Sequence, residues 1–215
     1  MIRVVVLDVD GTLMDTNYPH VEAWARACEE AGQRVPRAQI HRQVGKGSEN
    51  LIPEFVEGEE TMAEVDELHS EIYMDLQRYA YPLPGARELI ASLAERGYEV
   101  WLVTNAKPEE LEQYLDQLET EGKIAGIIKA AEVEEPKPAP DVFELALERA
   151  GGNADEIVAV GDTVWDVEAA AKAGIRTVAV LSGGAFSEEE LKEAGAVAVY
   201  DNCAELLNSG FPENH

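Results

Sequence analysis

The apolar residues of this chain gather in short uninterrupted runs, and stretches with helical periodicity separate most of these runs. Runs without alternation between apolar and polar positions are typical of strands in a parallel sheet that is covered on both faces. We predict strands at residues 3–7, 99–103, 125–128, 157–160 and 176–180, with a short edge strand at 197–199.

Three helical stretches between the predicted strands carry recognisable end signals. They cover about residues 84–97, 140–151 and 166–174; the first two begin with proline, and all three end at glycine. Proline near the start of a helix and glycine just past its end form the expected asymmetry. Strands that alternate with such helices predict an α/β fold with a doubly wound, Rossmann-like parallel sheet.

The alternation is interrupted once, between the first and second predicted strands. Roughly 90 residues separate these strands, whereas a complete strand–helix–strand unit needs only about 30. The surplus has helical spacing at Val21, Trp24 and Cys28, and a capping-box pattern at Thr61 and Glu64 predicts the start of another helix. We therefore expect a catalytic core of residues 1–15 and 82–215 with an inserted helical cap of residues 16–81.

The charge of the chain excludes several classes of partner. The net charge is −26, from 43 acidic and 17 basic residues, so the surface repels nucleic acid and anionic membranes. No apolar run approaches the length of about 20 residues that crosses a bilayer. Met1 leads directly into a predicted strand, so no signal peptide is visible and we expect a cytoplasmic protein.

Cysteine and histidine spacing indicates neither a disulfide framework nor a zinc site. Cys28 and Cys203 are the only cysteines and lie far apart in the sequence, which suits a reducing compartment. The four histidines show no spacing typical of zinc ligands.

Chemistry-bearing residues follow the predicted strands at their carboxyl ends. In a doubly wound sheet this edge is where ligands bind. The residues that we expect to converge there are Asp8, Asp10 and Gly11 after the first strand, Thr104 and Asn105 after the second, Lys137 after the third, and Asp162 and Asp166 after the fourth.

This set of groups suits a magnesium ion and a phosphoryl group. Carboxylate oxygens are ligands that Mg²⁺ prefers, and the ion would remove the repulsion between Asp8 and Asp10. Asp166, four residues after Asp162, could orient metal-bound water from outside the ligand set. Hydroxyl, amide, ammonium and backbone N–H groups can cradle phosphoryl oxygens, while one carboxylate attacks phosphorus and another transfers protons.

Taken together, these motifs resemble those of the haloacid dehalogenase superfamily of phosphatases. The stretches that carry the resemblance are DVDGT, the Thr-Asn pair, KPAP and GDTVWD, and they span nearly the whole chain. The inserted helices are similar to the small α-helical cap of the subfamily that contains phosphoglycolate-phosphatase-like enzymes. Pro136 departs from the small polar residue found there in many relatives, which concerns the shape of the loop before Lys137.

The resemblance implies a role for each matching residue. Asp8 would be the nucleophile and a metal ligand, and Asp10 would be the general acid and base and bind the metal through its backbone carbonyl. Asp162 would be the third protein ligand of Mg²⁺. Thr104 and Lys137 would bind the transferring phosphoryl group, and Lys137 would also offset the charge of Asp8.

Each motif also has a purely structural interpretation. DVDGT alone could be a turn in which an aspartate side chain bonds the backbone, and Asp162 and Asp166 could cap a helix. Thr104 and Asn105 could be turn residues, and Lys137 a surface lysine. In the predicted cap, His20 and Lys46 are possible substrate contacts, although a solvated position is an equal alternative for Lys46.

Four functions remain open from the sequence. The first is a Mg²⁺-dependent phosphatase that acts on a small phosphorylated metabolite, as a monomer or small homo-oligomer. The second is a phosphosugar mutase of the same superfamily, and the third a dehalogenase, which would have no use for Asp10. The fourth is a phosphate-binding protein with little or no turnover.

Overall fold

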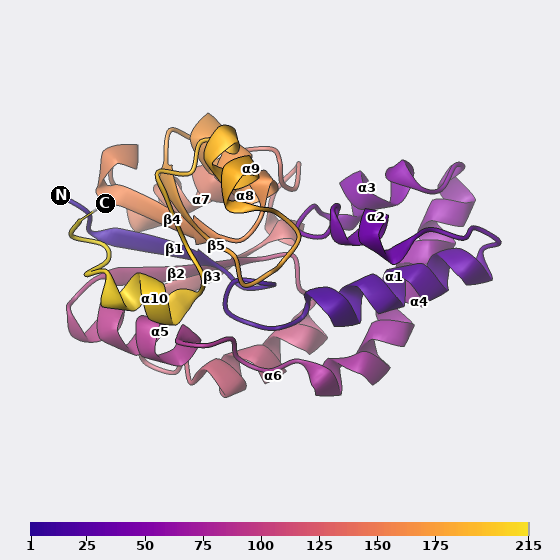
Figure 1. The fold of residues 1–215 in the computed structure, drawn as a ribbon, viewed down its shortest axis with the longest axis horizontal. Helices are drawn as coiled ribbons and strands as arrows, with labels where there is room; N and C mark the ends of the chain where they lie inside the picture. Colours follow the sequence, from indigo (N-terminus) through magenta and orange to yellow (C-terminus); the bar gives the residue numbers. More distant parts are fainter. Residues whose placement is uncertain (215) are drawn as a thin grey trace.

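Six parallel strands form the centre of the computed structural model, which describes residues 1–214 (Figure 1). Their order across the sheet is β3-β2-β1-β4-β5-β6. The strands are β1 (Val4–Asp8), β2 (Glu99–Thr104), β3 (Gly126–Lys129), β4 (Ile157–Gly161), β5 (Arg176–Val180) and β6 (Ala198–Tyr200). The predicted α/β fold with a doubly wound parallel sheet is confirmed.

The central strand β1 shows why the apolar runs form a covered sheet. Val5 lies opposite Val100 of β2 and Val158 of β4, and all three side chains are buried. Alternate residues of β1 belong to different hydrophobic clusters, because successive side chains point to opposite faces of a strand. A polar residue in this strand would be buried on either face.

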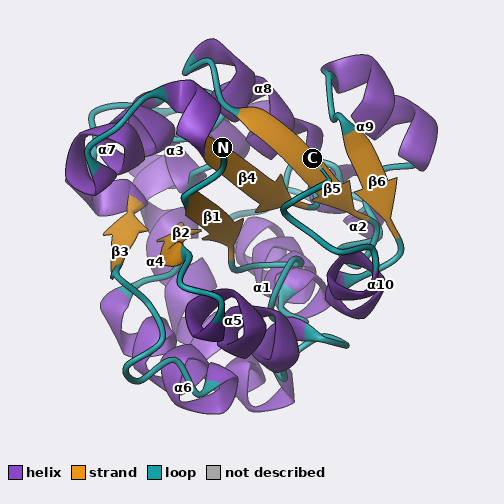
Figure 2. Cartoon of the chain, turned by 90° about the vertical axis from the view of Figure 1, so that its left-hand side faces the viewer, coloured by secondary structure: helices purple, strands orange, loops and turns teal. Residues whose placement is uncertain are grey.

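Helices cover both faces of the sheet, as Figure 2 shows. One face is covered by α5 (Ala86–Glu95), α6 (Pro108–Leu118) and α10 (Cys203–Asn208), which contribute to the larger cluster. The other face is covered by α7 (Asp141–Ala150) and α8 (Val164–Lys172). The short helix α9 (Glu188–Ala194) packs beside α8, and the 3₁₀ turns η3 (Ala130–Glu132) and η4 (Ala154–Glu156) connect elements of the core.

Residues 17–79 form a group of helices beyond the carboxyl ends of the strands (Figure 1). We call this group the helical segment. It contains α1 (Asn17–Glu30), α2 (Arg37–His41), α3 (Ser48–Leu51), η1 (Ile52–Glu54), α4 (Glu59–Leu76) and η2 (Gln77–Tyr79). A separate hydrophobic cluster, which includes Val21, Cys28, Ile40 and Val65, holds these helices together.

Two connections join the helical segment to the sheet, and they run side by side. The Asp15 amide donates to the Tyr81 carbonyl over 2.8 Å, and the Leu83 amide donates to the Leu13 carbonyl over 2.8 Å. The chain thus leaves and re-enters the core at neighbouring points, near residues 15 and 82.

One predicted helix start is wrong. The helix does not begin at a capping box formed by Thr61 and Glu64; α4 begins at Glu59, with Gly58 at its N-cap and no side-chain cap. Gly58 has φ +90°, a conformation that glycine adopts at little cost, and Glu59 and Glu60 place negative charge at the positive end of the helix. Among the helices of residues 1–214, none has both the length and the apolarity of a membrane span.

Candidate active site

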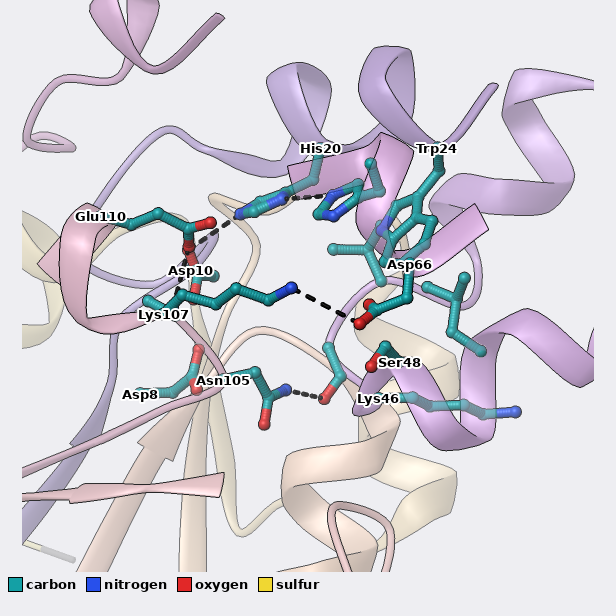
Figure 3. A pocket seen from close by; sticks show the side chains of 15 residues that line it. Asp8, Asp10, His20, Trp24, Lys46, Ser48, Asp66, Asn105, Lys107 and Glu110 are labelled. Carbon is teal, nitrogen blue, oxygen red and sulfur yellow. Dashed lines mark hydrogen bonds and ion pairs between the residues drawn. The ribbon is translucent and has the colours of Figure 1, made fainter. Parts of the chain in front are cut away.

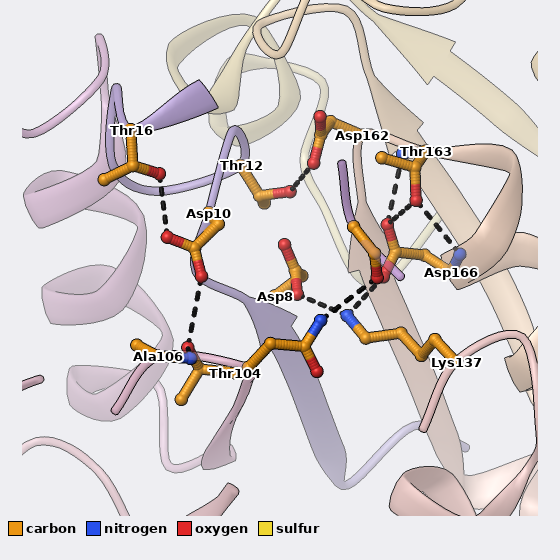
Figure 4. Close-up of polar contacts among 12 residues, drawn as sticks. Asp8, Asp10, Thr12, Thr16, Thr104, Ala106, Lys137, Asp162, Thr163 and Asp166 are labelled. Carbon is orange, nitrogen blue, oxygen red and sulfur yellow. Dashed lines mark hydrogen bonds and ion pairs between the residues drawn. The ribbon is translucent and has the colours of Figure 1, made fainter. Parts of the chain in front are cut away.

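The strand order brings the predicted site residues to one edge of the sheet (Figure 4). Asp8 is the last residue of β1, and β1 lies between β2 and β4. Thr104 ends β2 and Asp162 directly follows β4, so both lie beside Asp8. The position of each group therefore follows from where its strand ends.

Lys137 connects two carboxylates that are distant in the sequence. Its Nζ donates to Asp8 Oδ1 over 2.6 Å and to Asp166 Oδ1 over 2.7 Å, and the Lys137 side chain is only 1% exposed. Burial acts to lower the pKa of Lys137, but the charges of Asp166 and Asp8 outweigh burial and raise it above its usual value. The ammonium thus remains charged at the centre of the site.

Asp8 is a buried carboxylate with several like charges nearby. Burial raises its pKa well above the usual range; Lys137 opposes this effect, while Asp166, Asp162 and Asp10 add to it. Burial and Asp166 also raise the pKa of Asp162 to about 8, although hydrogen bonds from Thr12 and Asn17 oppose the rise. Such carboxylates are stabilised in their ionised form by a cation.

The residues fit a divalent cation. Oxygens of Asp8, Asp162 and Asp166 lie within 4.8 Å of one another, and all three residues are buried. Asp166 already uses both oxygens: Oδ1 accepts from Lys137, and Oδ2 accepts from the Thr163 amide over 3.1 Å. Asp166 is therefore already hydrogen-bonded within the cluster, and its role in orienting metal-bound water stays a prediction.

Asp10 points away from this cluster toward the helical segment (Figure 4). Its Oδ1 accepts from the Thr16 hydroxyl over 2.7 Å and lies 3.6 Å from His20 Nε2, and its Oδ2 accepts from the Thr104 hydroxyl over 3.2 Å. Burial acts to raise the pKa of Asp10, but the hydrogen bonds and charge of His20 and the bond from Thr16 bring it below the usual value. The hydrogen-bond and charge partners of Asp10 therefore differ from Lys137, the partner of Asp8.

Gly11 and Thr104 have partners within the chain, and their roles in phosphate binding stay predictions. The Gly11 amide donates to the Met14 carbonyl over 2.8 Å, so this N–H closes a turn. The Thr104 hydroxyl, expected to bind the phosphoryl group, joins Asp10 to the Ala106 amide. Both residues thus shape the loops around the carboxylates.

Comparison with known proteins identifies the family. Residues 2–174 match the haloacid dehalogenase-like hydrolases. The chain belongs to this family. It is 27% identical over 210 residues to a phosphorylated carbohydrates phosphatase of Thermotoga maritima, covering 96% of this chain and 97% of the relative.

Further relatives agree with this assignment. A phosphoglycolate phosphatase of Rhodospirillum rubrum is 29% identical over 226 residues, with 99% of this chain and 93% of the relative covered. The crystal structure of a hydrolase from Pseudomonas syringae superposes with a TM-score of 0.89 at 31% identity, covering 96% of this chain and 97% of that one. The resemblance inferred from the motifs is confirmed.

In this hydrolase of the haloacid dehalogenase-like family, a cavity of about 80 Å³ lies between the ends of the strands and the helical segment (Figure 3). Asp8 and Asp10 line it from the core, and His20 and Trp24 line it from α1. Lys107, between the end of β2 and the start of α6, also lines it. The cavity therefore places helical-segment side chains over the carboxylates.

The two candidates from the predicted cap differ in position. His20 lies beside Asp10; its Nδ1 is 3.2 Å from His69 Nε2, and its ring stacks on Tyr73. Lys46 also lines the cavity, but its Nζ pairs with Glu54 over 3.0 Å and lies over the Trp165 ring. Figure 3 shows the Lys46 ammonium directed away from the carboxylates.

Sequence reasoning missed several residues that hold the site. The Asn17 amide, from the first turn of α1, donates to Asp162 Oδ2 and to the Gly183 carbonyl, each over 3.2 Å. The Ser182 hydroxyl donates to the Gly11 carbonyl over 2.8 Å. A signal was present, because residues 182–184 follow β5 at the same edge of the sheet as the residues that were identified.

Proposed function

We propose that this protein is a Mg²⁺-dependent phosphatase that hydrolyses a small phosphorylated metabolite through an aspartyl-phosphate intermediate. The observation that carries the proposal is the pairing of buried Asp8 with Lys137 over 2.6 Å at the floor of a cavity that Asp10 also lines. A carboxylate, an ammonium group and a second carboxylate are the groups that phosphoryl transfer to and from an aspartate requires.

Three residues would hold the magnesium ion. They are Asp8 and Asp162 through their side chains and Asp10 through its backbone carbonyl. Asp166 would stay outside the ligand set, because its oxygens accept hydrogen bonds from Lys137 and Thr163. When bound, the ion supplies positive charge that offsets the clustered carboxylates and the phosphoryl oxygens.

The residues of the chain divide the reaction into two steps. Asp8 attacks phosphorus and forms the aspartyl phosphate, the bond from phosphorus to the leaving oxygen breaks, and Asp10 donates a proton to that oxygen. Asp10 then accepts a proton from water as the water oxygen attacks phosphorus, which releases Asp8 and phosphate. Lys137 remains beside Asp8 and offsets negative charge on the phosphoryl oxygens.

The environment of Asp10 suits both directions of proton transfer. His20 and Thr16 lower the pKa of Asp10 in the free protein, which is the state that a base needs. A phosphate dianion that enters beside Asp10 raises this pKa by charge repulsion, which is the direction that an acid needs.

The helical segment serves as the cap in this proposal, with the core in residues 1–15 and 82–215. Contacts cross from the segment to the core near the site: the Asn105 amide donates to the Gly45 carbonyl over 3.1 Å, and the Asn50 amide to the Lys137 carbonyl over 3.3 Å. The paired connections near residues 15 and 82 would allow the segment to open for substrate and close against water.

Hydrolysis of p-nitrophenyl phosphate tests the proposal. We expect steady phosphate release with Mg²⁺, loss of release with EDTA, and recovery when excess Mg²⁺ is added. Isomerisation of a sugar phosphate without phosphate release would instead indicate a mutase, and chloride release from a 2-haloacid a dehalogenase. Binding of Mg²⁺ and phosphate without turnover would show a binding protein.

A further inference from the structure

We infer that the leaving group of the substrate is a short, uncharged carbon skeleton with hydroxyl groups, and that Asp66 selects against a second anionic group. The inference rests on the proposed phosphatase function and names the class of its substrate. Asp66 lies on α4 and faces Lys107 across the cavity (Figure 3).

Buried polar atoms without hydrogen-bond partners belong to residues that line this cavity. Within residues 1–214, six buried side-chain polar atoms have no hydrogen-bond partner, and three of them belong to residues that line the cavity. These three are Asp66 Oδ1, His69 Nδ1 and Asn105 Oδ1. A buried polar atom without a partner is unfavourable, so a ligand that forms hydrogen bonds with these atoms would be stabilised.

The His69 ring contacts His20 through its other nitrogen. His69 Nε2 lies 3.2 Å from His20 Nδ1, and the proton of this contact can belong to either ring. His69 Nδ1 can therefore accept a hydrogen bond from a ligand or donate one to it, and a hydroxyl group can fill either role. His69 is only 5% exposed, so a ligand in the cavity is the natural partner for this atom.

The ammonium groups of the cavity lining already have acidic partners. Lys46 Nζ lies 3.0 Å from Glu54, and Lys107 Nζ lies 3.5 Å from Asp66 Oδ2 and also contacts Ser70. A carboxylate or second phosphate on the leaving group would therefore meet the free oxygen of Asp66 without a matching free ammonium in the described lining. Like charges in this position are repulsive.

The remaining lining limits the size and polarity of the leaving group. Trp24, Leu51 and Ala106 provide apolar surface for its carbon atoms. The volume of about 80 Å³ leaves room for only a few groups the size of water. A short polyol or small sugar matches both the apolar surface and the free acceptors.

Three phosphate esters of the same chain length test this inference. Glycerol 3-phosphate and 3-phosphoglycerate differ in a terminal hydroxyl against a carboxylate, and n-propyl phosphate has neither hydroxyl group. We expect kcat/KM for glycerol 3-phosphate to exceed that for each of the others by at least about tenfold, because the site pairs with hydroxyl donors.

An Asp66→Asn variant tests the origin of the selectivity. The variant removes the charge, so the preference for glycerol 3-phosphate over 3-phosphoglycerate should shrink to about threefold or less; the Asp66 side chain is 36% exposed, and solvent limits the size of its effect. Asp75→Asn is the matched control, because Asp75 lies on the same helix and is exposed outside the cavity lining. The control should keep the wild-type ratio.

Several results would overturn the inference. They are equal kcat/KM for the three esters, preference for 3-phosphoglycerate, no turnover of glycerol 3-phosphate, or an unchanged ratio in Asp66→Asn. These failures are distinct from failure of the proposed function, because p-nitrophenyl phosphate would still be hydrolysed with Mg²⁺. Absence of release from all four esters would refute the phosphatase itself.

Discussion

Gly183 and the Asp162 carboxylate approach each other so closely that no side chain fits between them. A Cβ atom added at Gly183 would lie 1.7 Å from Asp162 Oδ2 and 2.7 Å from Asn17 Nδ2. Asp162 cannot move away freely, because it is buried and its Oδ1 also accepts from the Thr12 hydroxyl over 3.0 Å. The loop after β5 therefore helps to position a proposed metal ligand.

A Gly183→Ala substitution should disturb the site more than the fold. We expect the displaced Asp162 to lower kcat/KM by about 10²-fold and to raise the Mg²⁺ concentration needed for activity. Phosphate release at a series of Mg²⁺ concentrations measures both effects. Gly97→Ala is the control: its Cβ would meet no atom within 4 Å, so only the positive φ of +83° reduces stability and activity should persist. Wild-type Mg²⁺ dependence in Gly183→Ala would contradict this account.

Asp8→Asn should remove nearly all turnover while the fold survives. The amide is close in shape to the carboxylate but is a poor nucleophile, so no aspartyl phosphate forms. Phosphate release and the thermal unfolding midpoint are the measurements. Asp155→Asn makes the same chemical change at an exposed position and should retain activity. Substantial turnover in Asp8→Asn would show that another group attacks phosphorus.

Asp10→Asn should slow the reaction by roughly 10²–10⁴-fold, the usual contribution of a general acid and base. The loss should be smaller for p-nitrophenyl phosphate than for an alkyl phosphate, because the nitrophenolate leaves readily without a proton. Rates for both esters are therefore measured with the same variant. A wild-type rate with the alkyl ester would refute the role assigned to Asp10.

Lys137→Met should destabilise the protein in addition to stopping catalysis. The substitution leaves Asp8 and Asp166 buried without their shared cation, and loss of one partner from a buried ion pair typically lowers stability by about 3–5 kcal/mol. Urea unfolding without Mg²⁺ measures the change. Lys192→Met, at an exposed pair with Glu188, should shift stability by less than about 1 kcal/mol. Equal effects of the two variants would argue against a structural role for the buried pair.

His69 should make the protein less stable in mild acid. Burial lowers the pKa of His69 well below its usual value, and the charges of His20 and Lys107 lower it further. The unfolded chain takes up this proton below about pH 6.5 while the folded protein does not, so stability falls by up to about 1.4 kcal/mol per pH unit below that point.

The measurement for His69 is urea unfolding at pH 7.5, 6.0 and 5.0, with His69→Gln as the comparison. The variant lacks the titrating group, so its stability should fall less steeply with decreasing pH. Parallel pH profiles for the two proteins would show that His69 binds a proton equally well in the folded and unfolded states.

Much of the core could be predicted because its signals are local. An uninterrupted apolar run such as residues 4–7 is stable only where both faces of a strand are covered, and the strands lie within about two residues of the predicted ranges. Asp8 and Asp162 could be brought together without coordinates, because parallel strands end at the same edge of a sheet.

Other features depend on packing between distant segments, and local sequence carries little information about them. Thr61 lies in a valid capping pattern, yet the turn at Gly58 starts α4 earlier. Lys46 was a candidate for substrate binding, but Glu54 and Trp165 hold its ammonium. The contact between His20 and His69 joins α1 to α4, which no spacing along the chain indicates.

The sequence by itself determined the parallel sheet and the family of the chain, because hydrophobic periodicity and the motifs at strand ends are properties of short segments. Tertiary structure alone decided which groups pair: Asp166 with Lys137, Asp10 with Thr16 and His20, and Asp162 with Thr12 and Asn17. Hydrogen bonds and charge interactions depend on distances of a few ångströms between side chains. Those distances are set only when the helical segment packs against the ends of the strands.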